Sequence, residues 1–155
     1  MRDRLQQRLA EHPALNTDDD LGTIGVIDET SVAKKGRKTP GVQRQYCGSR
    51  GKVENCIVTV HLGIVCGLFK TLIDATLFLP KAWSDDRERC RDAKIPDDVV
   101  YRPKWRIALE QLWRALSNGL TFNWFDLRRI LRQQTRVLGR TRRSTRDVLC
   151  RRDSA

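Results

Sequence analysis

The sequence has little that would support a disulfide-bonded, zinc-binding or membrane-spanning protein. Its five cysteines are odd in number and form no C-x-x-C pair, so neither a disulfide framework nor a structural zinc site is indicated. No stretch approaches the roughly 18 consecutive apolar residues that a membrane span needs, and charged residues follow Met1 where a signal peptide would be apolar. We therefore expect free thiols, a cytoplasmic location and no membrane partner.

Signals for nucleotide binding are also missing. The glycines fit neither the dinucleotide-binding pattern nor the P-loop pattern, so the sequence contains no Gly-rich phosphate loop. Aromatic residues make up only 6% of the chain, and most of them are needed for a core. The 155 residues suit one domain rather than two.

Positive charge is abundant and unevenly distributed. The chain carries 30 lysines and arginines against 19 aspartates and glutamates, a formal net charge of +11. Residues 121–155 hold 10 arginines and 3 aspartates, without any lysine or glutamate, whereas residues 1–120 hold 20 basic and 16 acidic residues. A strongly basic protein favours a polyanionic partner, nucleic acid first and a membrane surface second. This expectation depends heavily on the arginine-rich tail.

Strands are predicted in the first half of the chain. The run 22–30 is rich in β-branched residues, is bounded by glycine and ends in acids, which predicts a buried strand. Three further stretches, separated by turn signals, have the composition of strands. They are 41–46, 56–65 and 69–78. Consecutive strands with short connections predict an antiparallel meander.

Helices are predicted at the start and after the strands. The first twenty residues have the composition of a helix end followed by a solvated linker. Ser84 precedes two acids, a pattern typical of an N-cap, so a short charged helix is expected from there to about Ala93. Apolar residues recur at helical spacing from Trp105 to Asn118, which predicts a helix that covers the sheet.

Asp28 is the main candidate for chemistry. A strand buried on both faces has no structural use for an ionised acid, whose burial is costly unless it is paired or binds a metal. Successive side chains of a strand point to opposite faces, so Glu29 cannot act together with Asp28 from this element alone. The spacing leaves a second interpretation open, in which Asp28 only ends the strand and caps the following turn.

Candidate nucleic-acid contacts follow this first strand. Their side chains suit phosphate oxygens, which position a nucleic acid without reading its sequence. The candidates are Lys34, Lys35, Arg37, Lys38, Gln43 and Arg44. On these residues alone, an ordinary solvated hairpin tip is the favoured interpretation. Weaker candidates, as platforms on which bases could stack, are Gln45 and Tyr46 with Trp83 and Tyr101.

The histidine in the predicted strand 56–65 is interpreted as part of the core. His61 lies between apolar neighbours, where a satisfied core histidine is more common than a ligand or a base. Together with Cys56 and Cys66 it could be offered as a Cys–His catalytic arrangement. Nothing in the sequence orients these three residues, and their order matches no known signature, so we reject that arrangement.

Several short segments, in a fixed order, resemble the central part of DDE transposases of bacterial insertion sequences. The resemblance extends over about residues 2–124, and the order of the segments makes it specific. The segments are Ile27-Asp28-Glu29-Thr30, Lys34-Lys35-Gly36, Gly41-Val42-Gln43-Arg44-Gln45-Tyr46, Glu54-Asn55-Cys56, Leu79-Pro80-Lys81-Ala82-Trp83, Asp85-Asp86-Arg87-Glu88-Arg89-Cys90 and Ile95-Pro96-Asp97.

The resemblance implies an α/β fold class, in the form of a partial RNase H-like mixed sheet with flanking helices, followed by an irregular basic tail. In that family three acids gather two Mg²⁺ ions about 4 Å apart, which activate the attacking oxygen and stabilise the leaving one. By its motif, Asp28 corresponds to the first catalytic and metal-binding acid.

The other two acids of the family pattern have no clear counterpart. The second acid lies in a segment resembling W-L-T-x-D-E-x-Y-G, where this chain has Trp124-Phe125-Asp126. Asp126 stands two residues after the tryptophan and the pattern requires four, so we do not carry the role over to it. The third acid, a glutamate much further along, is missing.

These observations predict a transposase-like DNA-processing protein whose intact relatives cut and join DNA at insertion-sequence ends, with this chain an inactive fragment. DNA is the expected partner and Mg²⁺ the implied cofactor. The alternative is a small, basic, non-enzymatic DNA-binding protein that interferes with transposition, for example by associating with an intact transposase. A metal-dependent nuclease is a third interpretation. The expected parts are a helix end and linker (1–20), an incomplete RNase H-like core (21–124) and a basic tail (125–155).

The basic tail begins where the second acid should lie, which suggests a shifted reading frame. One permitted back-translation of residues 124–140, with the third base of the Phe125 codon deleted, gives W-L-T-F-D-E-Y-Y-G-N-K-P-E-F-L-G. This peptide restores the acid segment, with its aspartate four residues after the tryptophan. Many third codon positions in this back-translation are not fixed by the protein sequence. Only the codons of the gene can therefore decide whether the reading frame is shifted. A frameshifted tail would have no selected fold and would be readily proteolysed.

Overall fold

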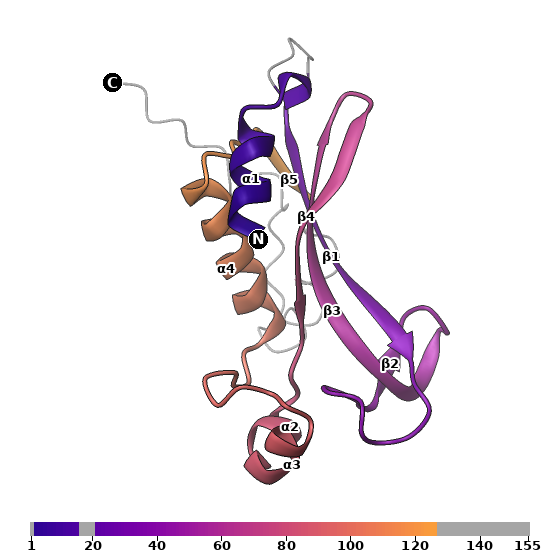
Figure 1. The fold of residues 1–155 in the computed structure, drawn as a ribbon. Coiled ribbons are helices and arrows are strands. Elements are labelled where there is room, and N and C mark those ends of the chain that lie inside the picture. Colours follow the sequence, from indigo (N-terminus) through magenta and orange to yellow (C-terminus); the bar gives the residue numbers. More distant parts are fainter. Residues whose placement is uncertain (1, 16–20, 127–155) are drawn as a thin grey trace, which may run out of the picture.

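The structure is a computed structural model, and it describes residues 2–15 and 21–126 (Figure 1). Over these residues the chain forms an α/β arrangement of four α-helices and one five-stranded mixed sheet. The helices are α1 (Arg2–Ala10), α2 (Lys81–Ser84), α3 (Arg87–Asp92) and α4 (Lys104–Ser117), with a 3-10 helix η1 (Pro13–Leu15) after α1. The strands are β1 (Ile24–Ala33), β2 (Gln43–Cys47), β3 (Lys52–Cys66), β4 (Phe69–Leu77) and β5 (Trp124–Asp126).

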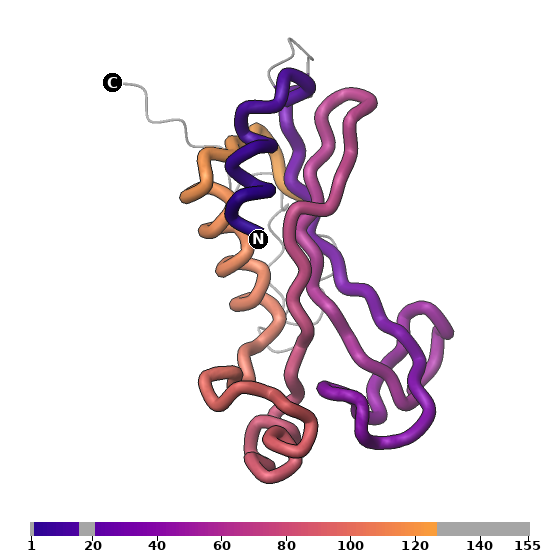
Figure 2. The backbone as a smooth tube through the Cα atoms, in the orientation of Figure 1, coloured from indigo at the N-terminus to yellow at the C-terminus, as the bar shows by residue number. Residues whose placement is uncertain are grey.

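The sheet is organised around β1 and β3. The strand order is β2-β3-β1-β5, and β4 pairs with β3 beyond the stretch that pairs with β2. β3 is antiparallel to β1, β2 and β4, so the three predicted strands are present and pair antiparallel. They do not form a simple meander, because β2 and β4 pair with successive parts of the same edge of β3. β5 runs parallel to β1, which therefore lies inside the sheet between β3 and β5. Figure 2 shows the β1–β3 ladder curving away from the helices towards its β2 end.

One face of the sheet forms the core. From Cys56 to Cys66, every second residue of β3 is apolar and buried, which is the alternation expected of a strand with one covered face. These residues pack against Ile107, Ala108 and Ala115 of α4. Figure 1 shows α1 and α4 on the same side of the sheet. We call the other side the open face, because α1 and α4 do not cover it; within the described residues, α2 and α3 pack against it only at its β2 end, around Ile57.

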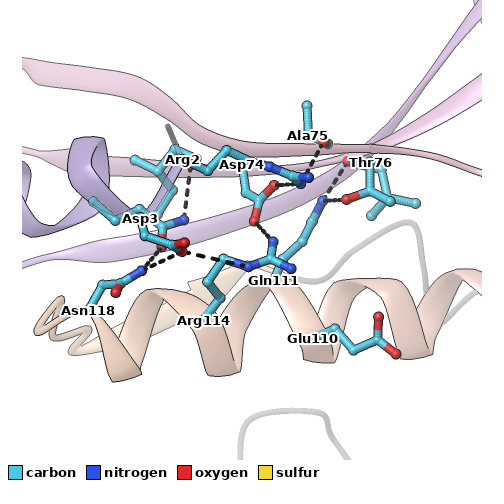
Figure 3. Close-up of polar contacts among 12 residues, drawn as sticks. Arg2, Asp3, Asp74, Ala75, Thr76, Glu110, Gln111, Arg114 and Asn118 are labelled. Carbon is cyan, nitrogen blue, oxygen red and sulfur yellow. Dashed lines mark hydrogen bonds and ion pairs between the residues drawn. The ribbon is translucent and has the colours of Figure 1, made fainter. Parts of the chain in front are cut away.

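A buried polar network fixes α1 against β4 and α4 (Figure 3). The carboxylate of Asp74 on β4 has no exposed surface and accepts hydrogen bonds from Arg2 at 2.9 Å and from Arg114 at 2.5 Å. Gln6 is also buried, and its side chain accepts a hydrogen bond from Asn118 at 2.8 Å. The charge-assisted bonds to Asp74 and the amide bond of Gln6 together hold three elements that are far apart in the sequence.

The predicted helix starting at Ser84 is placed differently in the structure. Ser84 ends α2 and its hydroxyl accepts a hydrogen bond from the Tyr101 backbone N–H at 2.9 Å. The N-cap of α3 is Asp86, whose carboxylate accepts from the Arg89 backbone N–H at 3.0 Å. A carboxylate satisfies this orphan donor and also interacts favourably with the helix dipole.

The helix predicted from Trp105 is present as α4, with Asn118 as its C-cap. Its apolar residues, however, divide between two sides. Ile107, Ala108, Gln111 and Ala115 are buried against the sheet. The larger apolar side chains lie outward and are partly exposed, with fractions between 39% and 68%. They are Trp105, Leu109, Trp113 and Leu116.

No helix in the described ranges is long and apolar enough to cross a membrane. The cysteines within those ranges are all buried. They are Cys47, Cys56, Cys66 and Cys90. Cys150 and the predicted basic tail beyond Asp126 lie outside the described residues.

Candidate functional site

Asp28 lies on the open face of the sheet, in the middle of β1. Its side chain is exposed, and its Oδ1 accepts a hydrogen bond from the Glu29 backbone N–H at 2.8 Å. The expectation of a strand buried on both faces is therefore wrong, because Asp28 and its neighbour on this face, Thr30, are both exposed. An exposed carboxylate keeps its hydration without a buried partner, so it is available to a cation.

Glu29 is directed to the other side of the sheet, as strand alternation requires. Its carboxylate forms an ion pair with the Lys104 ammonium at 2.5 Å, at the start of α4. Both side chains are less than one-fifth exposed. Glu29 thus joins the sheet to the helix layer and does not accompany Asp28 on the open face.

His61 is the cross-strand neighbour of Asp28 in the β1–β3 register. Directly opposed residues of an antiparallel pair share a face, with Cβ atoms about 4.5–5.5 Å apart. The Nε2 atom of His61 is hydrogen-bonded to the Thr59 hydroxyl at 2.7 Å, and its buried Nδ1 has no partner among the described residues. The prediction of a satisfied core histidine is wrong.

The sequence could not place His61 beside Asp28, because the strand register is not visible in either segment alone. The register does support rejecting the Cys–His arrangement. Cys56 and Cys66 are each five residues from His61 on the same strand. An odd separation puts a cysteine on the opposite face of the sheet from the histidine.

Asp126 ends β5 and does not reach the level of Asp28. In the parallel β1–β5 register, Asp126 pairs with Val26, two residues before Asp28. Within the described residues, no group of three or more His, Cys, Asp or Glu side chains could hold a metal ion. The described donors therefore supply one carboxylate and do not form a complete two-metal site.

A second region is a cavity of about 430 Å³ between the β1–β2 loop and α3. Three of the six predicted DNA-contact residues line it, namely Arg37, Gln43 and Arg44. Arg89 of α3 joins them, and sequence reasoning missed it because α3 is more than 40 residues further along the chain. We call this cavity the arginine pocket. The other three predicted contacts do not line it; they are Lys34, Lys35 and Lys38.

Trp83 contacts two residues that line the arginine pocket, Arg89 and Val42. Its side chain is only 1% exposed, and its indole N–H donates to the Val42 backbone carbonyl at 2.7 Å. The Arg89 guanidinium lies 3.7 Å from the centre of the Trp83 ring, a cation–π contact. The prediction that Trp83 offers a platform for a base is wrong, because Arg89 covers its ring.

Comparison with known proteins gives two matches. Residues 1–125 match the family described as DDE superfamily endonuclease. The chain is also 38% identical, over 102 residues, to a protein of Microchaete diplosiphon described as the probable transposase for insertion sequence element IS701. The alignment covers 64% of this chain and 23% of that relative, so the chain spans about a quarter of its length. No solved structure gives a significant match.

Proposed function

Because the chain belongs to the DDE superfamily endonucleases, we propose that it represents the first part of the catalytic core of an insertion-sequence transposase. In this proposal Asp28 is the first metal-binding and catalytic acid. The main support for this proposal is the position of Asp28, which is exposed on the open face of a strand that lies inside the sheet. Carboxylates that bind catalytic metals need this combination of a rigid backbone and an accessible side chain.

The proposed architecture is a partial RNase H-like core. Three antiparallel strands, a helix on one face and a parallel strand beside β1 support it. Gly25 allows β5 to pack closely, since a Cβ at this position would lie 2.4 Å from the Phe125 ring. The domain division proposed from the sequence places this core at 21–124, although β5 continues to Asp126.

Mg²⁺ is the cofactor that family membership implies. When bound, such metals would polarise the scissile phosphate and lower the pKa of the attacking water. The residues described here provide only the Asp28 carboxylate towards such a site, with His61 beside it. We therefore propose that this chain, by itself, does not cleave or join DNA.

The β1–β5 register supports a shifted reading frame after Trp124. Paired residues in these two strands are one hundred positions apart, as in Val26 with Asp126. A carboxylate level with Asp28 would therefore have to stand four residues after Trp124 if the same pairing continued. That spacing is the one in the peptide W-L-T-F-D-E obtained from the alternative frame. Sequencing the gene tests this: codons that give no transposase-like peptide in either other frame would end the proposal.

DNA is the proposed partner, contacted by Lys34, Lys35, Arg37, Lys38, Gln43 and Arg44. The grouping of three of these residues in the arginine pocket supports this role. The same observation favours the second candidate function, a non-enzymatic DNA-binding protein that interferes with transposition by occupying DNA ends or by associating with an intact transposase.

The deciding experiment compares the wild type with Asp28→Ala in two assays on duplex DNA, cleavage with Mg²⁺ and binding across a range of salt concentrations. We expect no cleavage by either protein and equal, salt-sensitive binding by both, because counterion release drives phosphate contacts. Cleavage that disappears in Asp28→Ala would establish an active nuclease and contradict the proposed inactivity. Absence of DNA binding by the wild type would contradict both candidate functions.

A further inference from the structure

The arginine pocket combines three guanidinium groups with two neutral amides. Arg37 comes from the β1–β2 loop, Arg44 from β2 and Arg89 from α3, while Gln43 and Asn55 complete the polar lining. Among the residues that the structure describes, no carboxylate lines the cavity. A concave site that has several hydrogen-bond donors and no negatively charged side chain is suited to binding an anion.

Five arginines elsewhere in the described chain are paired with acids, whereas those of the pocket are not. Arg2 and Arg114 share Asp74, Arg87 pairs with Asp97, and Arg102 and Arg106 share Glu110. No such ion pair is formed, among the described residues, by any of the three arginines of the pocket.

Glu54, the acid whose charge interacts with that of Arg44, already forms an ion pair with a lysine. Glu54 on β3 forms an ion pair with Lys52 at 2.9 Å. A hydrogen bond from Lys52 and the positive charges around it, including that of Arg44, lower the pKa of the Glu54 carboxyl. Glu54 is paired with Gln45, whereas Arg44 is paired with Asn55, so the two side chains project from different faces of the ladder. The charge of the arginine pocket is therefore left for a ligand.

Arg89 is held in place before any ligand arrives. Its guanidinium lies on the Trp83 ring and donates to the Arg37 backbone carbonyl at 2.9 Å. Asn55 donates to the backbone carbonyls of Lys34 and Gly36, which fixes the loop that carries Arg37. Side chains already ordered in this way lose less conformational entropy on binding, so each contact contributes more to affinity.

We propose that the arginine pocket binds one backbone phosphate of DNA, held jointly by Arg44 and Arg89. This inference rests on the proposed function, because that function supplies DNA as the polyanion. The pocket lies beyond the end of β1, five residues from Asp28, which corresponds to about 17 Å along a strand. The bound phosphate is thus a flanking one, about five base pairs from Asp28 at about 3.4 Å per pair.

The test measures binding of a fluorescent duplex by anisotropy between 50 and 200 mM salt, with Arg44→Gln, Arg89→Gln and the double variant. The control is Arg91→Gln, which removes an exposed arginine of the same helix that does not line the pocket. Each pocket variant should weaken binding about tenfold and lower the salt slope by about 0.9, the contribution of one phosphate contact. Arg91→Gln should change neither quantity.

The double variant distinguishes one shared phosphate from two separate ones. If Arg44 and Arg89 hold the same phosphate, the double variant lowers the salt slope by about 0.9, no more than either single variant. A loss of about 1.8 would show two independent phosphates and overturn the proposal. Pocket variants that behave like Arg91→Gln would also overturn it, while leaving DNA binding and the proposed function intact.

A titration with inorganic phosphate, followed by NMR of the Arg89 side-chain Nε–H, separates DNA from a free anion. A shift with phosphate that duplex DNA reproduces and saturates supports the proposal. A shift with phosphate alone, in a protein that does not bind DNA, would show a free-phosphate site and overturn the DNA assignment. Arg89→Lys keeps the charge without the planar fork, and it should recover less than half of the lost binding free energy.

Discussion

The two faces of the sheet consist of alternate residues of the same strands, and they differ in burial and in the polar groups they carry. On the helix side, β3 presents a continuous apolar row that is buried against α4. The row is Val58, Val60, Leu62 and Ile64. On the open face, β3 presents Thr59 and His61, and β1 presents Asp28 opposite the histidine.

This difference separates stability from chemistry within single strands. Burial of apolar surface on the helix side supplies the free energy that holds the backbone in place. The open face then carries polar groups on a rigid support, where they can meet a ligand. The same strand residues could not serve both purposes, because an exposed catalytic carboxylate contributes little to the core. Substitutions on the two faces should therefore have clearly different effects.

The largest expected contrast is between two leucines on adjacent strands. Leu62 is fully buried on the helix side, whereas Leu72 is 61% exposed on β4. Leu62→Ala should lower the free energy of unfolding by roughly 2–5 kcal/mol, because it removes buried methyl groups and leaves a cavity. Leu72→Ala should change it by less than about 0.5 kcal/mol. Urea denaturation followed by circular dichroism measures both, and equal losses would contradict the assignment of the faces.

A smaller contrast concerns two arginines of α4. Arg114 contacts the buried Asp74 carboxylate, whereas Arg106 forms an exposed pair with Glu110. Arg114→Met should cost roughly 1–3 kcal/mol, because Asp74 keeps only Arg2 as a charged partner. Arg106→Met should cost less than about 0.5 kcal/mol, as is typical of exposed ion pairs. The same denaturation assay decides, and an insensitive Arg114→Met would mean that the network does not hold α1 in solution.

The outward side of α4 provides a third contrast. Trp113 is 68% exposed and belongs to the apolar stripe that faces away from the sheet. Trp113→Gln should change the free energy of unfolding by less than about 0.5 kcal/mol, while it lowers the fluorescence of bound ANS, because exposed apolar surface is removed. Arg106→Gln, on the same helix, is the control. A large loss of stability in Trp113→Gln would show that the tryptophan is covered in solution.

Local patterns predicted the elements better than their surroundings. The run 22–30 and the stretch 56–65 have the β-branched and alternating composition of strands, and both lie within strands of the structure. The apolar spacing from Trp105 correctly predicted α4 but not which side packs. Small residues such as Ala108 and Ala115 allow the helix to approach the sheet closely, so the largest apolar residues do not mark the buried side.

The candidate site depended on information that no local pattern contains. Asp28 was identified by a motif, but its neighbour His61 follows from the pairing register of two strands about thirty residues apart. Arg89 entered the arginine pocket because α3 returns to the β1–β2 loop, a tertiary arrangement. The burial of Asp74 depends on a bulge in the β3–β4 pairing at Leu62, which also has no sequence signature.

The smallest expected effect is a pH dependence that comes from the helix side of β3. Burial raises the pKa of the Cys56 thiol to about 11, whereas a thiol in the unfolded chain titrates near about 8.5. Between these values the unfolded state loses its proton and the folded state keeps it. The contribution of Cys56 to stability is thus complete below about pH 8.5 and is lost as the pH rises towards about 11. Denaturation midpoints between pH 8 and 11 should therefore fall less steeply in Cys56→Val than in the wild type. Cys66→Val is the control for removal of another buried thiol from β3. Identical slopes in the wild type and Cys56→Val would show that Cys56 is not held in the core.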